Sequence, residues 1–213
     1  MKLVSVNVGL PREVDANGHR VRTSIWKAPV AGRVRVRTLN LDGDRQSDLS
    51  VHGGVDKAVY AYPSEHYAFW QRELGRAELP WGAFGENLTT EGLLDDEVAI
   101  GDRVRAGTAE LEVTQPRMPC FKLALRFERP DLVKRFQKSG RTGFYFRVLQ
   151  EGEVGAGDAL ELMRAPGDRV SIADAMRVAI DRRADPEQVR RISVLPGLSA
   201  VWREEFLERL AHG

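Results

Sequence analysis

Gln115-Pro-Arg-Met-Pro-Cys-Phe-Lys-Leu123 is the stretch around which the chain is organised, and it holds the only cysteine, Cys120. Apolar and polar residues alternate over 109–114 just before it, and this period of two predicts a half-buried strand. Apolar residues at helical spacing follow it. Cys120 is therefore expected at the point where a strand ends and a helix begins.

The setting of Cys120 leaves two interpretations open. Pro116 and Pro119 fix the backbone of this connection and restrict the residues that precede them. A helix start with Arg117 and Lys122 nearby favours the thiolate over the thiol, and a thiolate suits a nucleophile or a metal ligand. A lone cysteine is, however, more often a small buried hydrophobe without chemistry of its own.

Length, charge and cysteine content narrow the class of protein. The 213 residues suit one large or two small domains with a core that needs no disulfide. The formal net charge is +1, so we expect no general nucleic-acid-binding face. A single cysteine is typical of a reducing compartment. Because the start of the chain lacks signal-peptide features and no stretch approaches the roughly 20 apolar residues that span a bilayer, we expect a cytoplasmic protein without a membrane contact.

The first 165 residues show many short β-prone runs and few long helical patterns. Residues 2–8 alternate apolar and polar side chains, as does the run 33–37, and each predicts a strand. Helical patterns interrupt these runs, for example over 65–74. The sequence therefore predicts a mainly β fold with helical insertions, an α+β arrangement built on a β-barrel.

Two glycine-containing turns carry polar residues of interest. His52 precedes Gly53 and Gly54, which have no Cβ and allow a ligand to approach the backbone. His52 could then donate a proton or a hydrogen bond, and Lys57 could pair with an anion. A His-Gly-Gly turn is also typical of a purely structural turn. Asn87 lies in the second turn, 82–87, where polar side chains either satisfy the loop backbone or face a pocket.

Residues 166–213 differ from the rest, because three helical patterns follow one another there. The first begins after Ser171, the second at Asp185 with a proline at its first helical position, and the third after Ser199. The unit has about 45 residues, close to the ~40 below which a domain seldom folds alone. It is therefore expected to pack on the main body or on a partner.

A set of short motifs in a fixed order carries a family resemblance. In chain order the motifs are Gly43-Asp44-Arg-Gln46, Val51-His-Gly-Gly54 with Asp56-Lys57-Ala58, Gly85-Glu-Asn-Leu88, Gly101-Asp102 and Gln115-Pro-Arg-Met-Pro-Cys120. With them the chain resembles a MOSC-domain protein, of the family named for the C-terminal domain of molybdenum cofactor sulfurase. The helical tail resembles the accessory region of small bacterial members of the YiiM kind. The resemblance implies a MOSC-type β-barrel over 1–165 and a three-helix accessory domain over 166–213.

The resemblance also implies a chemistry. In proteins of this kind the activity is the reduction of N-hydroxylated bases such as 6-hydroxylaminopurine, which detoxifies them. Cys120 would be the protein ligand to molybdenum. From the residue type alone, His52 is the expected second catalytic residue and proton donor, because an unperturbed imidazole titrates near neutral pH. The cofactor, molybdopterin, ends in a phosphate, and its expected partners are Arg117, Lys57, Asn87, Arg141 and Lys122. A soft thiolate suits a transition metal.

Other functions stay open at this point. Cys120 could carry persulfide sulfur, or the barrel could bind the cofactor without turning over a substrate. A third possibility is a barrel in which the cysteine has no chemical role and the helical tail forms an interaction surface. If the protein is a reductase, we expect a small N-hydroxylated substrate. We also expect a separate electron-donor reductase as a partner, because no flavin, haem or iron–sulfur motif occurs in the sequence. A homodimer is a further expectation.

Overall fold

The computed structural model describes residues 1–16, 18–47 and 53–212, so the predicted proton donor His52 lies outside the described residues. The strands are β1 (Lys2–Val8), β2 (Arg12–Ala16), β3 (His19–Thr23), β4 (Ala28–Pro29), β5 (Arg33–Val36), β6 (Val59–Pro63), β7 (Leu88–Glu91), β8 (Arg103–Ala106), β9 (Ala109–Pro116), β10 (Phe144–Gln150), β11 (Gly152–Gly155) and β12 (Leu160–Met163). The helices are η1 (Val55–Lys57, a single 3₁₀ turn), α1 (Glu65–Leu74), α2 (Phe121–Phe127), α3 (Leu132–Lys138), α4 (Ile172–Ile180), α5 (Pro186–Ser193) and α6 (Ala200–His212).

The main sheet has eight strands in the order β12-β8-β9-β10-β6-β7-β1-β4. Its pairs are antiparallel except for β6 and β7, which run parallel. Side chains alternate between buried and exposed along β8, as expected for a strand with one face on the core. In the central pair β9–β10, Gln115 lies opposite Tyr145 and Pro116 opposite Phe144. This register fixes the end of β9, and with it the start of the stretch that contains Cys120.

The predicted mainly β fold with inserted helices is confirmed, but the described residues form no closed barrel. The sheet has two edges, at β12 and at β4. The residues just before β12 contact the start of β1, where Lys2 forms an isolated bridge with Ala159 and the Leu3 N–H donates to the Asp158 carbonyl at 2.8 Å. β1 already pairs with β7 on its other side, and this second contact is too short to be a ladder. The sheet therefore curls without closing.

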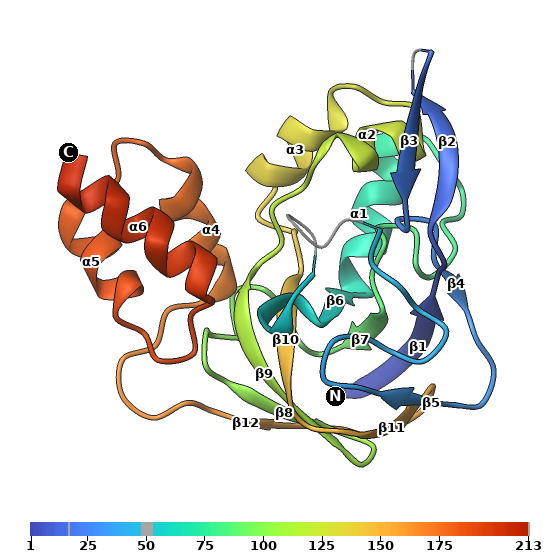
Figure 1. Cartoon of the computed structure of the whole chain (residues 1–213), viewed down its shortest axis with the longest axis horizontal. Coiled ribbons are helices and arrows are strands. Elements are labelled where there is room, and N and C mark those ends of the chain that lie inside the picture. The colour runs from blue at the N-terminus through green and yellow to red at the C-terminus, as the bar shows by residue number, and fades with distance from the viewer. Residues whose placement is uncertain (17, 48–52, 213) are drawn as a thin grey trace.

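A second, aromatic core lies beside the sheet, where α1, α2 and α3 gather (Figure 1). The Tyr62 ring lies 4.6 Å from that of Phe84, and the Trp70 ring stacks on Phe136 at 5.1 Å. Offset and edge-to-face ring pairs of this kind stabilise a core beyond their buried area. This cluster anchors α2, the helix that follows Cys120. No helix among the described residues is both long and apolar enough to cross a bilayer.

The three predicted helices of the tail are confirmed together with their caps. The Ser171 side chain accepts from the Asp174 N–H at 3.1 Å, and Asp185 accepts from the Glu187 N–H at 2.9 Å. The Ser199 hydroxyl accepts from the Trp202 N–H at 3.3 Å. Each cap satisfies a donor that the first helical turn leaves without a partner.

The tail packs on the main body. This is one of the two arrangements that the sequence predicted, the other being packing on a partner. Ile172, Trp202 and Phe206 belong to the same buried apolar cluster as Leu3 of β1. The Ile100 N–H donates to the Val170 carbonyl at 3.1 Å. One hydrophobic core therefore runs across the predicted boundary at residue 165, and removal of the tail would expose it.

Gly197 of the tail packs tightly against Gly101 of the main body. A Cβ atom at this position would lie 2.4 Å from the Cα and 2.6 Å from the N of Gly101. We expect Gly197→Ala to lower the free energy of unfolding by about 1–3 kcal/mol, the usual cost of overpacking. Urea denaturation would measure it. Gly155→Ala is the control, because its Cβ would meet nothing nearer than 3.4 Å; equal losses in the two variants would contradict this account.

Candidate functional site

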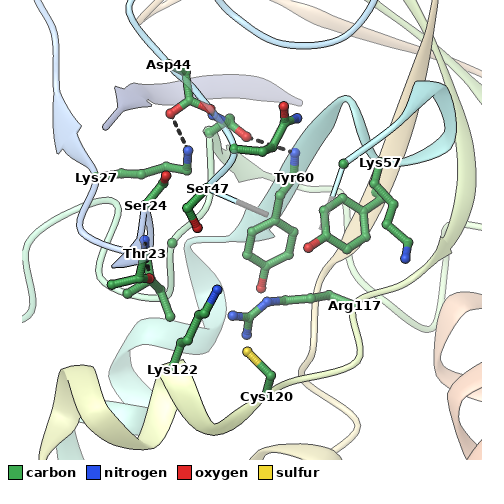
Figure 2. A pocket seen from close by; sticks show the side chains of 16 residues that line it. Thr23, Ser24, Lys27, Asp44, Ser47, Lys57, Tyr60, Arg117, Cys120 and Lys122 are labelled. Carbon is green, nitrogen blue, oxygen red and sulfur yellow. Dashed lines mark hydrogen bonds and ion pairs between the residues drawn. The ribbon is translucent and has the colours of Figure 1, made fainter. Parts of the chain in front are cut away.

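A pocket opens above the start of α2, where residues distant in the sequence meet (Figure 2). Its empty volume is about 610 Å³, including the part open to solvent, which is in the range of small-molecule and cofactor sites. The walls come from the end of β3, the loop before η1, β6 and the connection between β9 and α2. Among its lining residues are Thr23, Lys27, Asp44, Lys57, Tyr60, Asn87, Arg117, Cys120, Lys122 and Tyr145.

Cys120 lies where the sequence predicts it, between the end of β9 and the start of α2. It is the N-cap residue of α2, with extended backbone angles (φ −122°, ψ 174°), and its side chain makes no capping hydrogen bond. The thiol is partly exposed and faces the pocket (Figure 2). Among the described residues no group of three or more His, Cys, Asp or Glu side chains could hold a metal ion. Cys120 is therefore a single soft donor at this place.

Arg117 is a buried cation of the pocket with a hydrogen-bond donor left unused by the described residues. It is only 6% exposed, and its guanidinium lies over the rings of Tyr60 and Phe136, at 5.0 and 5.6 Å. Its Nη1 atom is buried and has no hydrogen-bond partner among the described residues. Burial by itself lowers the pKa of Arg117, but Tyr60, Tyr145 and Cys120 nearby raise it, and the net pKa is raised. A buried cation with an unused donor is costly, and an anionic ligand would satisfy it.

Two lysines add positive charge around Arg117. Lys122 is buried at 8% exposure, forms no hydrogen bond or ion pair with the described residues, and points toward Arg117 and Cys120 (Figure 2). Lys57, on η1, lines another wall. Burial lowers the pKa of Lys57, while Glu205 and Asp56 raise it by less. The structure thus brings together five of the predicted site residues, Cys120, Arg117, Lys122, Lys57 and Asn87. The part around Cys120 is suited to negative charge.

The opposite wall is held by a buried ion pair. Lys27 contacts Asp44, and both side chains are nearly inaccessible to solvent. Asp44 also accepts from the Gly9 N–H at 2.8 Å and from the Asn87 amide at 2.9 Å. Burial lowers the pKa of Lys27, and Asp44 offsets part of this effect. Ser24 adds a buried hydroxyl with no partner among the described residues, so this wall is polar but charge-balanced.

The predicted partner Asn87 lines the pocket, but its amide group is engaged by the protein. Its Oδ1 accepts from the Tyr60 N–H at 3.1 Å, and its Nδ2 donates to Asp44. Glu86 beside it is fully buried and accepts from the backbone of Gly82 and Phe84 at 2.8 and 3.0 Å. Burial raises the pKa of Glu86, although hydrogen bonds from the Tyr67 hydroxyl and the Gly82 N–H lower it. Both side chains therefore hold the loop and the wall in place.

Arg141 is not brought to the pocket. Its guanidinium lies over the Phe69 ring at 4.4 Å and donates to the Ser139 carbonyl at 3.3 Å. It lines a different hollow, with His66 and Asp95. The structure gives no geometry for His52, whose neighbour Gly53 lines the pocket. Arg141 therefore lies outside the pocket that contains Cys120.

Sequence reasoning missed Tyr60, Tyr145 and Lys27. The two tyrosine rings lie 5.2 Å apart and form an aromatic wall beside Arg117. Burial raises the pKa of Tyr145, so its hydroxyl keeps its proton at neutral pH. The tyrosines lie in β-prone runs where they are indistinguishable from core residues. The sequence did point to Asp44, because it lies in the Gly43–Gln46 motif. The motif did not indicate a role for its side chain.

Comparison with known proteins places the chain in a family. The MOSC domain family matches residues 48–161, and the family described as YiiM-like, 3-alpha helix domain, matches residues 170–213. The crystal structure of YiiM from Geobacillus stearothermophilus superposes with a TM-score of 0.83 at 41% identity, covering 98% of each chain. Protein YiiM of Escherichia coli is 38% identical and covers 90% of this chain and 86% of its own.

A third relative is longer than the others. It is a protein named Reductase from Gibberella moniliformis, 35% identical over 85% of this chain but over only 33% of its own length. The YiiM relatives, in contrast, are matched over most of their own length, 86% for the Escherichia coli protein and 98% for the Geobacillus stearothermophilus structure. The chain belongs to the MOSC-domain family and carries a YiiM-like three-helix domain.

Proposed function

We propose that the protein is a molybdenum-cofactor-dependent reductase of N-hydroxylated compounds, such as 6-hydroxylaminopurine, with Cys120 as the protein ligand to molybdenum. MOSC domains in general are associated with this cofactor. One observation carries the proposal: a thiol lies beside a buried guanidinium whose Nη1 has no partner among the described residues. A soft donor next to an unsatisfied cation suits a metal that enters as part of an anionic cofactor.

The residues of the pocket have separable roles in this proposal. Cys120 Sγ offers the metal ligand, and Arg117 with Lys122 holds the anionic portion of the cofactor. Asn87 and the Lys27–Asp44 pair keep the opposite wall in place. When bound, the cofactor supplies the electron chemistry that reduces an N–OH group to N–H with release of water.

Proton supply would come from residues at the pocket wall. Tyr145 keeps its hydroxyl proton at neutral pH and lies at the same wall as Arg117. It can donate a hydrogen bond to a bound group from there. His52 stays the proposed proton donor from sequence. The electrons are proposed to come from a separate reductase.

The proposal is tested on protein made in a host that synthesises the cofactor. We expect molybdenum and pterin to copurify with the chain, and turnover of 6-hydroxylaminopurine with a chemically reduced dye as electron source. Metal analysis, pterin fluorescence and product chromatography on one preparation measure this. Protein from a cofactor-deficient host is the control and should be inactive.

One outcome would favour the rival function. If Cys120 acts as a sulfur carrier, the purified protein should contain no molybdenum and should release thiocyanate on treatment with cyanide. That result, with no turnover of the hydroxylated base, would overturn the reductase proposal.

A further inference from the structure

The Asp56 carboxylate joins the three-helix domain to the wall of the pocket. Asp56, in η1, accepts a hydrogen bond through Oδ2 from the N–H of Ala200, the first residue of α6, at 2.9 Å. Its Oδ1 lies 2.8 Å from Nη2 of Arg147 on β10. Asp56 thus serves the start of a helix that lies 144 positions later in the chain. Because Lys57 follows it and Gly53 precedes it at the pocket, α6 is tied to that wall.

Further contacts make this connection a network. The Thr114 hydroxyl donates to the Asp56 carbonyl at 2.6 Å, and the Ser199 N–H donates to the Thr114 carbonyl at 3.3 Å. Arg147 donates to the Gly197 carbonyl at 3.3 Å. The backbone just before α6 is therefore held by the same residues that hold η1. A shift of α6 would have to break these bonds or move η1 with it.

An acidic residue of α6 also acts on the pocket wall, through the charge of Lys57. Glu205, one turn beyond the start of α6, and Asp56 both raise the pKa of Lys57 against the effect of burial. Both acidic groups thereby favour the charged ammonium of Lys57 at the pocket wall. In Figure 2 this ammonium points away from Arg117, so Lys57 forms a separate edge of the site.

We infer that the three-helix domain belongs to the binding site: α6 positions the pocket segment 53–57, and Asp56 is the positioning residue. The inference rests on the proposed function of the pocket as an anion and cofactor site. Asp56 touches neither Cys120 nor Arg117, and acts through the segment that contains Lys57. The domain would then serve ligand affinity as well as stability.

Ala200→Pro is the sharpest test of this inference. Proline lacks the N–H that Asp56 accepts, yet it is favoured at the first position of a helix, and Ala200 is exposed. The matched control is Asp185→Ala, which removes an equivalent carboxylate cap from α5 without contact to the pocket. Asp56→Ala removes the same bond from the other side, should Ala200→Pro fail to fold.

Two measurements on the full-length, cofactor-free protein decide the outcome. Hydrogen exchange should speed up about two- to tenfold over 53–60 in Ala200→Pro and Asp56→Ala, the effect of one lost hydrogen bond, and not in Asp185→Ala. Titration with inorganic phosphate should show weaker binding in the same two variants alone. Asp56→Asn keeps an acceptor oxygen for Ala200 and should recover most of the protection.

The inference is overturned if exchange over 53–60 matches that of Asp185→Ala, or if exchange rises while phosphate affinity is unchanged. Failure of the proposed function looks different. In that case wild-type protein binds no phosphate and no molybdenum, while the exchange data still report whether α6 holds the segment.

Discussion

Replacement of Cys120 by serine is expected to reduce turnover of N-hydroxylated bases by more than about 100-fold, because even the outer partners of a metal site contribute about 10–100-fold. A neutral hydroxyl is a poor substitute for a thiolate on a soft metal. The fold should not suffer. Cys120 occupies the N-cap position of α2 with an extended backbone and without a capping bond, and serine is a preferred N-cap residue. We therefore expect an unchanged or slightly higher melting temperature.

Cys120→Ala distinguishes the effect of a capping side chain on stability from the effect of the metal ligand on turnover. Alanine cannot cap α2, so this variant should lose turnover and molybdenum without the gain in stability. Melting temperature, molybdenum content and turnover should be measured on the same preparations. A well-folded Cys120→Ser protein that keeps molybdenum and full turnover would refute the ligand role, and a marked loss of stability with normal turnover would show that Cys120 serves packing.

Arg117→Met is expected to weaken cofactor binding about 10- to 150-fold, the equivalent of one charge-assisted hydrogen bond of about 1.5–3 kcal/mol. Stability of the cofactor-free protein should stay equal or rise. Methionine fills a similar space over the Tyr60 and Phe136 rings, and it removes a buried charge with an unsatisfied donor. Molybdenum and pterin content after dilution, together with denaturant melts, measure both effects.

Arg141→Met is the matched control for Arg117→Met. It removes the same kind of side chain, also from a contact with an aromatic ring, but outside the pocket. Cofactor content should stay at the wild-type level in this variant. Equal losses from Arg117→Met and Arg141→Met would show that net charge, and not the buried position of Arg117, controls binding.

The sequence predicted those parts of the site that depend on local structure. The change from alternating to helical spacing placed Cys120 at the junction of β9 and α2. Cap residues placed the three helices of the tail, because a capping side chain acts within one turn of its own position. Arg117 and Lys122 reached the pocket because they lie within three residues of Cys120.

Parts that depend on long-range contacts were not predictable in this way. Arg141 turns away because Asp95 accepts from the N–H groups of Thr142 and Gly143, at 3.1 and 2.8 Å, and so fixes the backbone beside it. Asp95 is distant in sequence, and no local pattern connects it to this loop. The open sheet has a similar cause, since only the register of β1 against both of its neighbours decides whether a barrel closes.

The short contact between β1 and residues 157–160 has a consequence for synthesis on the ribosome. When β1 leaves the ribosome, neither β7 nor residues 157–160 have been synthesised. The Leu3 N–H therefore cannot yet donate to the Asp158 carbonyl. The core also lacks Trp202 and Phe206 until α6 has been synthesised. Contacts that close such long loops form late and leave apolar surface exposed in the meantime. We therefore expect β1 to be among the last strands to gain its partners, and the nascent chain to expose apolar surface until then.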